Sequence, residues 1–559
     1  MTTSTSTVGT VAVLAGPSAV ADRRLRSIVA TINRAGWEVT VLVADPDGTV
    51  VADRLPDGTV LRPVPVPRGP GSTVGRYRRS PLRRPLAYPA DVRTTARTQR
   101  VRARRADLEA RRSRLELAED GIRTAAARTW WSIADTVART RAGWVDLRER
   151  HSIAAREHGD RDDRVDSVVT RCWTMLRRQH AWRSLDPSLW DFELGFGELL
   201  DQLRPTVIHV ADSALLGVGA RARLRALADG YHTGLLWDAD RDLPGSGPEP
   251  GHYRTWTARC CQEAEYAPDA DAVMTGSEEL AETLRQRHRL PVRPTVVLDA
   301  PDMSAPDEAA PASDLRRRCG IDEHGFVLVS ATPLADMDLD TVVAGVGQLR
   351  DVHLVVCDPD PAGGRPERLR RLALDHSVVD RCHVLPIPAT RELLATADAA
   401  VLAHRPSAVA QHRLPAAFFD HAHARVPVIV GDLRAMARVT RHTGHGEVYW
   451  SGNPNDFARA ARLVLTEPGT YRDAYLRHGL LDEWTWQHQT PIVEALYAGL
   501  LRRAGDRPAL ATGHARGGRV YRPRRHSEIA GLPPVPEPTV PVTEHPVSVA
   551  GGSGEPKRW

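Results

Sequence analysis

The sequence predicts an α/β protein with two Rossmann-like domains, a helical arginine-rich insertion in the first domain and a disordered C-terminal tail. Short apolar runs typical of buried strands alternate with helical patterns in two blocks, 1–302 and 313–482. A hinge rich in Pro and Ala, 303–312, joins the blocks, and a stretch without this alternation, 68–189, interrupts the first. The 559 residues are enough for two or three domains that each bury a core.

The first strand–helix–strand unit lies at the N-terminus. "TVAVLA", from Thr10 to Ala15, reads as a buried strand, and "WEVTVLVAD" as the next one. Between them we expect a helix that Ser18 caps and Gly36 ends, because apolar residues recur there at helical spacing: Leu25, Ile28, Val29 and Ile32. Such a unit is the beginning of a Rossmann-like sheet.

The insertion and the C-terminal segments follow different patterns. Residues 68–100 are rich in Arg and Pro and read as loop, whereas 101–183 read as long helices. The alternation resumes at "RPTVIHVADS" and, after the hinge, continues from "GFVLVSATP" to "GEVYWSG". An amphipathic helix is expected at 483–505. Residues 506–559 are rich in Gly, Pro and Arg without periodicity, which predicts disorder.

Composition excludes several classes of function. The chain is 42% hydrophobic and 26% charged, as in soluble globular proteins. A formal net charge of +5 is small for this length and accompanies no nucleic-acid motif, so we expect no nucleic-acid partner. Lys557 is the only lysine, which excludes a phosphate-binding or Schiff-base lysine in the folded body.

The cysteines and the N-terminus indicate a reducing compartment. The six cysteines form no CxxC pair, and "MTTSTSTVGT" is unlike a signal peptide. No apolar run approaches the ~18 residues of a membrane-spanning helix. We therefore expect a cytoplasmic protein, with attachment to the inner face of a membrane as an option.

The arginine-rich insertion has two readings that the sequence leaves open. It could be a solvated helical hairpin held by ion pairs four residues apart. It could also bind an anionic membrane surface, because four tryptophans near arginines suit an interfacial helix: Trp130, Trp131, Trp144 and Trp173.

Several longer stretches resemble the family-4-like glycosyltransferases of the GT-B fold. They include "DRRLRSIVATINRAGWEVTVLVA", "LRPTVIHVADS", "LLWDADRDLPG" and "APDADAVMTGSEELAETLRQRHRLPVRPTVVLDAPD" in the first block. In the second block "RLPAAFFDHAHARVPVIVGD" matches the segment that ends LPxKLFEYLAAGxPVVASD, and "WTWQHQTPIVEALY" resembles the helix that crosses back to the first domain. The resemblance covers 9–66 and 190–503.

The resemblance implies a retaining transferase that holds a nucleotide-sugar donor between the domains, with no metal or other cofactor. The first domain would be the acceptor side and the second the nucleotide-sugar side. The resemblance implies catalytic roles for His209 and Asp240, and acceptor-side roles for Gly16, Asp212 and Arg241. The donor-binding candidates are Asp420, His412, Arg413, Arg405 and Thr332. His421 and His423 are two residues apart, do not share a helical face, and are therefore not expected to bind a metal.

The sequence departs from the family pattern mainly at polar positions that would face the donor. Asp420 stands where the family has Glu, and Ala417 stands where it has Lys. Further replacements are Arg425 for Gly, His412 for an acid, Ala211 and Asp240 for His, and Asp299 for Asn. Asp420 could bind a ribose or sugar hydroxyl, or it could be solvated or cap a helix. Two functions therefore remain: a glycosyltransferase acting on a glycan or lipid-linked acceptor, and a degenerate pseudo-glycosyltransferase acting as a binding or scaffold subunit.

Overall fold

The computed structural model describes most of the two predicted blocks and part of the insertion. The described residues are 8–17, 22–45, 48, 50–55, 57–66, 97, 101, 122–156, 163–186, 189–248, 252–304, 314–360, 365–477 and 479–506. Nearly all of the predicted loop at 68–100, most of the hinge at 303–312 and nearly all of the tail at 506–559 lie outside them.

The first domain is built on an eight-stranded sheet in the order β3-β4-β2-β1-β5-β6-β7-β8. All neighbouring strands are parallel except β3 and β4, which are antiparallel. The strands are β1 (Gly9–Ala15), β2 (Trp37–Asp45), β3 (Asp53–Arg54), β4 (Val60–Pro65), β5 (Val207–Val210), β6 (Gly234–Ala239), β7 (Ala272–Thr275) and β8 (Thr295–Val296). The order reverses between β1 and β5, which is the topological switch point of such a sheet.

Helices cover both faces of this sheet and bury a core on each. On one face lie α1 (Arg23–Arg34) and the C-terminal helix α20 (Trp486–Asp506). The other carries α6 (Leu189–Leu203), α7 (Leu216–Ala228) and α9 (Tyr253–Tyr266), while α8 (Leu243–Ser246) and α10 (Glu278–His288) follow β6 and β7. Asp22, not Ser18, caps α1, because its Oδ1 accepts a hydrogen bond from the backbone N–H of Leu25 at 3.1 Å. Ser18 lies outside the described residues.

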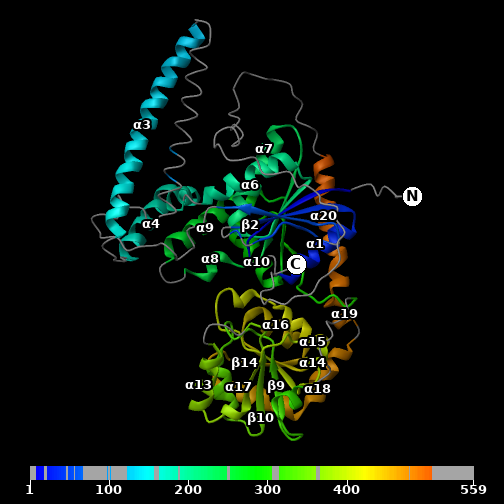
Figure 1. Ribbon diagram of the computed structural model, residues 1–559. Coiled ribbons are helices and arrows are strands. Elements are labelled where there is room, and N and C mark those ends of the chain that lie inside the picture. The colour runs from blue at the N-terminus through cyan, green and yellow to red at the C-terminus, as the bar shows by residue number, and fades with distance from the viewer. Residues whose placement is uncertain are drawn as a thin grey trace, which may run out of the picture.

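The insertion contributes the helices α3 (Ile122–Arg156), α4 (Asp163–Arg177) and α5 (Trp182–Leu185). Figure 1 shows α3 standing clear of the sheet of the first domain, with α4 near its base. Trp182 attaches the insertion to the domain: its side chain is fully buried in the core, and its Nε1 donates to Glu265 at 2.6 Å. Arg183 adds two hydrogen bonds to the same carboxylate.

The second domain has a six-stranded parallel sheet in the order β11-β10-β9-β12-β13-β14. Its strands are β9 (Phe326–Ser330), β10 (Val352–Cys357), β11 (Cys382–Leu385), β12 (Ala399–Leu402), β13 (Val428–Gly431) and β14 (Gly446–Tyr449). The helices are α11 (Leu315–Cys319), α12 (Leu339–Val346), α13 (Arg365–Asp375), α14 (Arg391–Leu394), α15 (Ala416–His423), α16 (Arg434–Thr443), α17 (Pro454–Thr466), α18 (Pro468–Asp473) and α19 (Leu480–Glu483). Two apolar clusters fill the two faces.

The chain returns to the first domain through α20, which packs beside α1 (Figure 1). Trp486 at its start is buried and donates from Nε1 to Thr31 Oγ1 at 2.8 Å. Farther along the helix, the hydroxyl of Tyr497 lies 2.8 Å from Nδ1 of His209 on β5. The predicted fold class, two Rossmann-like domains, is confirmed.

Candidate functional site at the domain boundary

A single arginine of the first domain links the two domains. Arg23, the first residue of α1, donates from NH1 to both carboxylate oxygens of Asp420 on α15, at 2.9 and 3.0 Å. The same guanidinium donates to Asp299, from Nε to Oδ1 at 3.2 Å and from NH2 to the backbone oxygen at 2.7 Å. The structure therefore places Asp420 on the face of the second domain that meets the first.

The opposite charges of this cluster stabilise each other's ionised forms. Burial raises the pKa of Asp420 above its usual value, and the adjacent Arg23 opposes that change. For Arg23, burial alone would lower the pKa, but the carboxylates of Asp420 and Asp299 raise it overall. Side-chain exposures of 33% for Arg23 and 22% for Asp420 leave both groups within reach of solvent. A polar ligand at this boundary would compete with an existing ion pair.

A second contact between the domains involves His412, one of the predicted donor-binding residues. The hydroxyl of Ser277, which caps α10, donates to the backbone oxygen of His412 at 2.5 Å. Arg438 of α16 forms an ion pair with Glu279 of α10. The ring of His412 is buried, its Nδ1 has no hydrogen-bond partner in the described structure, and burial lowers its pKa. His412 thus contributes a neutral ring to the boundary.

The acceptor-side candidates meet at the carboxyl edge of the first sheet. A Cβ on Gly16 would lie 2.6 Å from Oδ2 of Asp212, so a larger residue after β1 would displace this carboxylate. Oδ1 of Asp212 accepts from the backbone N–H of Ala214 at 2.9 Å. Arg241 contacts Asp240 at 2.7 Å, and this hydrogen bond is the main cause of the raised pKa of Arg241, with a smaller contribution from Asp212. Asp240 is half exposed, so a substrate could reach it.

The predicted catalytic role of His209 is not compatible with its position. Its side chain is fully buried on β5, where Nδ1 bonds to Tyr497 and Nε2 lies 3.7 Å from Asp238 without a hydrogen-bond partner in the described structure. No substrate could touch this ring without opening the core. His209 is therefore a core residue between the sheet and α20, because the side chain of a central strand position points into the covering helix layer.

Sequence reasoning missed the buried ion pair beside His209. Arg24 donates from NH1 to both oxygens of Asp238 at 2.7 and 2.8 Å. Burial alone would raise the pKa of Asp238, but Arg24 reverses the effect, so the pKa falls below its usual value. Arg24 and the equally overlooked Arg23 both lie in "DRRLR", directly after the first strand and loop. Two adjacent arginines at the start of a mostly buried helix were the available signal.

The remaining donor-binding candidates lie at the carboxyl edge of the second sheet but are not joined to Asp420. Thr332 follows β9, is buried, and its hydroxyl has no partner in the described structure. Arg405 and Arg413 are exposed on the segment between β12 and α15. Burial, with Arg413 as the next contribution, lowers the pKa of the neighbouring His404 to about 4. Within the described residues, neither arginine forms an ion pair with Asp420.

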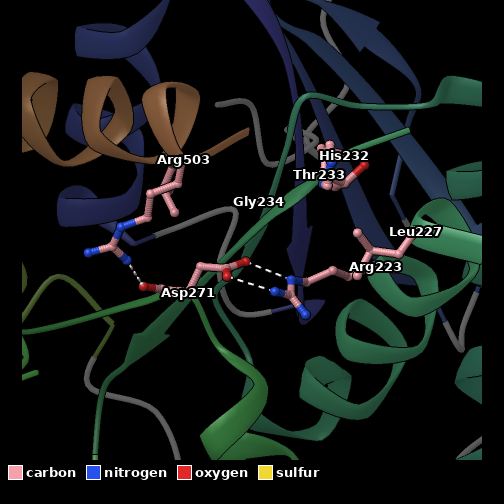
Figure 2. Close-up of a pocket in the computed structure, with 8 residues that line it drawn as sticks. Arg223, Leu227, His232, Thr233, Gly234, Asp271 and Arg503 are labelled. Carbon is pink, nitrogen blue, oxygen red and sulfur yellow. Dashed lines mark hydrogen bonds and ion pairs between the residues drawn. The ribbon is translucent and has the colours of Figure 1, made fainter. Parts of the chain in front are cut away.

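A small pocket lies at the opposite edge of the first sheet (Figure 2). Arg223 of α7 holds both oxygens of Asp271 at 2.6 and 2.7 Å, and Arg503 of α20 donates to the backbone oxygen of Asp271. Thr233 and Gly234 place the pocket at the start of β6. Ligands of open α/β sheets bind at the carboxyl ends of the strands. We therefore regard this ion-paired pocket as structural.

The described residues contain neither a cluster of metal-binding side chains nor a membrane-spanning helix. No group of three or more His, Cys, Asp or Glu side chains is placed to hold a metal ion there. Among the helices described, none has both the length and the apolar character needed to cross a membrane.

Comparison with solved structures relates the fold of this chain to that of glycosyltransferases. No family model and no curated protein matches the sequence. Sucrose-phosphate synthase from Thermosynechococcus elongatus superimposes with a TM-score of 0.54 at 14% identity, covering 89% of this chain and 100% of that one. A glycosyltransferase from Rickettsia africae gives 0.49 at 9% identity over 88% of this chain and 99% of its own. Anabaena HepE in complex with UDP-glucose gives 0.44 at 14% identity over 57% and 83%.

At these identities the likeness establishes the fold alone. Of these three structures, the first has a TM-score above 0.5, and this chain covers it completely. An architecture of two α/β domains, each built on a parallel sheet, is what this chain shares with it. The chain has the GT-B fold and resembles the GT-B glycosyltransferases.

Proposed function

We propose that this protein is a glycosyltransferase that moves a sugar, with retention of anomeric configuration, from a nucleotide sugar to a glycan or lipid-linked acceptor. The observation that carries the proposal is the contact between Asp420 and Arg23. A carboxylate that can accept hydroxyl hydrogen bonds and a cation that can bind a diphosphate meet at the domain boundary. Departure of a nucleoside diphosphate leaves an anion that such a site must stabilise.

Each charged residue of the boundary has a role in this proposal. Asp420 accepts hydrogen bonds from the ribose or the donor sugar once Arg23 releases it. Arg23 then turns to the diphosphate, where Arg405 and Arg413 of the second domain add positive charge, since guanidinium groups bind phosphates in a bidentate way. On the first domain, Asp240 and Asp212 are acids available to orient an acceptor hydroxyl.

A lipid-linked acceptor would place the reaction at the surface of a membrane. We propose the cytoplasmic face, with the protein attached peripherally. The positive charge of the insertion supports an anionic surface as the partner.

A second candidate function, a pseudo-glycosyltransferase that binds or scaffolds a partner, is favoured by the same contact. Both oxygens of Asp420 are already bonded to Arg23, and Ala417 offers no cation where the resembling family has lysine. If the ion pair never opens, it is a structural contact between the domains rather than part of a donor site.

Thermal-shift titration with a panel of nucleotide sugars distinguishes the two functions, because a ligand that binds only the native state raises the melting temperature. The proposal expects at least one donor to do so. Asp420→Asn should then weaken its binding roughly ten- to a hundred-fold, since a hydrogen bond to a charged group contributes about 1.5–3 kcal/mol. Asp340→Asn, an exposed acid of the same domain, is the control and should bind normally.

Two results would decide against parts of this proposal. If no nucleotide sugar stabilises the wild type, the pseudo-glycosyltransferase function replaces it. If a donor binds wild type and Asp420→Asn equally well, donor binding stands but Asp420 is not a ligand.

A further inference from the structure

The insertion helices α3 and α4 expose apolar side chains that a soluble helix would normally bury. Of the 21 large hydrophobic residues exposed in the described structure, nine lie on these two helices. They are Trp130, Ile133, Val137, Trp144 and Leu147 on α3, and Val168, Val169, Met175 and Leu176 on α4. Such a concentration marks an interaction surface rather than scattered surface residues.

The pattern on α4 is inverted. Val168, Met175 and Leu176 recur at the spacing of one helical face, and that face is solvent-exposed, with Met175 at 79% and Leu176 at 78%. The side that packs on the domain instead carries the fully buried Thr170 and the half-buried Trp173. Burying threonine while exposing methionine and leucine costs free energy in the isolated protein, which a partner covering the outer face would recover.

On α3 the large and small apolar residues are likewise on opposite sides. Its buried positions are Ala138, Ala142 and Val145. The exposed large apolar residues of α3 named above form an outer stripe, in which Trp130 is 74% exposed. With 3.6 residues per turn, the acids Asp135, Asp146 and Glu149 project to the half of the helix away from that stripe. The outer stripe is therefore apolar and free of negative charge.

The charge of the two helices selects the kind of partner. Together they contain ten arginines and five acidic residues, a net charge of +5 that equals the net charge of the whole chain. Two copies of this surface would repel each other, which disfavours self-association. A partner with an apolar layer and negative charge would match the exposed apolar side chains and the positive charge of these helices. The headgroup region of an anionic bilayer has both properties.

We propose that the outer faces of α3 and α4 form an interfacial membrane-binding surface, with the apolar side chains in the headgroup–acyl boundary and arginines against anionic headgroups. The base is rigidly positioned, because Trp182 and Arg183 fix the insertion to Glu265 of α9. This surface would locate the membrane contact of the proposed transferase. The purpose of that contact rests on the proposed function, whereas the membrane binding itself does not.

Co-sedimentation of the full chain with vesicles tests this surface without any nucleotide sugar. Vesicles containing phosphatidylglycerol should bind the protein, vesicles of phosphatidylcholine alone should bind it far less, and added salt should weaken the binding. Met175→Ser with Leu176→Ser should reduce binding roughly tenfold or more, because two apolar side chains no longer enter the interface. Arg171→Gln should reduce it roughly fivefold. Leu463→Ser, an exposed apolar residue on α17, is the matched control and should have no effect.

Three outcomes would overturn the proposal. The first is no vesicle binding, or equal binding to neutral vesicles. The second is a dimer of the wild type that the Met175/Leu176 double substitution dissociates, because the occupant would then be a second copy. The third is salt-sensitive binding to soluble polyglutamate as strong as to vesicles and unchanged by the double substitution, which would indicate an acidic protein. A failure here with intact nucleotide-sugar stabilisation would leave the proposed transferase in place.

Discussion

The two domains share a fold but treat their buried polar groups differently. In the first domain, three buried acids are paired with cationic or ionisable side chains. The pairs are Asp238 with Arg24 at 2.7 Å, Asp242 with Arg287 at 2.8 Å and Glu263 with His288 at 3.0 Å. Such pairs need both partners, because a charge left alone in a low-dielectric interior has lost its water.

In the second domain, several of the buried polar side chains are uncharged histidines. Burial lowers the pKa of His421 to about 4 and that of His445 to about 3, as it does for His404. His445 is enclosed by aromatic rings, with centroids 5.3 Å from Phe418 and 5.5 Å from Trp484. These rings need no counter-ion, but they require a pH at which they stay neutral.

The comparison shows why Asp420 stands out. It is an acid of the second domain whose cation, Arg23, belongs to the first. The second domain thus depends on the first domain for the counter-charge of this partly exposed acid. The stability of the individual domains and the contact between them are therefore separately testable.

The largest expected effect is the loss of the first domain's buried ion pair. Asp238→Asn keeps the shape but leaves Arg24 without a counter-charge, which should lower the free energy of unfolding by about 3–5 kcal/mol. Urea denaturation followed by circular dichroism measures this. Arg368→Gln, which breaks the exposed pair with Asp340, should cost less than about 1 kcal/mol. Equal costs would remove the distinction between buried and exposed pairs.

The second prediction concerns acid stability of the second domain. Its buried histidines have folded pKa values below the unfolded value near 6.5, so the unfolded chain binds protons first as the pH falls. Stability present above pH 6.5 is therefore lost progressively towards pH 4. Between pH 7 and pH 5 each such histidine should cost roughly 2 kcal/mol.

Replacing a buried histidine by a ring that cannot bind a proton tests whether these histidines cause the pH dependence. His445→Phe should reduce the pH dependence of unfolding by roughly 2 kcal/mol, because phenylalanine cannot bind a proton in either state. His324→Ala, on the surface of the same domain, should leave the dependence unchanged. An unaltered pH profile in His445→Phe would mean that this histidine does not govern acid sensitivity.

The third prediction compares the packing of the two sheets. A Cβ on Gly446 would overlap the backbone oxygen of Val428, its partner on β13, so Gly446→Ala should destabilise the second domain by about 1–3 kcal/mol. In the first domain, a Cβ on Gly219 would lie 2.8 Å from Cγ2 of Val210 and 2.9 Å from Cδ1 of Leu235, so side chains rather than backbone would have to shift. Gly219→Ala should cost less than Gly446→Ala, because side chains can shift more readily than backbone and alanine favours the helix. Differential scanning calorimetry of both variants measures the two costs, and a larger cost for Gly219→Ala than for Gly446→Ala would contradict the prediction.

The smallest expected effect is on the link between the domains. A double-mutant cycle of Arg23→Gln and Asp420→Asn should give a coupling energy of about 0.5–1 kcal/mol, since both side chains are partly exposed. Additive single effects would show that the ion pair contributes nothing to holding the domains together.

The sequence by itself determined the fold class and the position of the strands. Apolar runs such as "TVAVLA" and "VPVIVG" are typical of strands buried on both faces of a parallel sheet, and they recur with helical patterns between them. It also indicated that Asp420 faces the boundary between the domains. These features depend on local periodicity and on the resemblance of whole stretches, both of which can be read from the sequence.

Only the tertiary structure decided which side chains meet. Arg23 and Asp420 are 397 positions apart, and Arg24 and Asp238 are 214 apart, so no local pattern pairs them. His209 follows the pattern of a functional strand end, yet α20, arriving from the far end of the chain, buries it behind Tyr497. Contacts of this kind arise when distant segments pack together, and the free energy that selects them belongs to the assembled core rather than to any single stretch of residues.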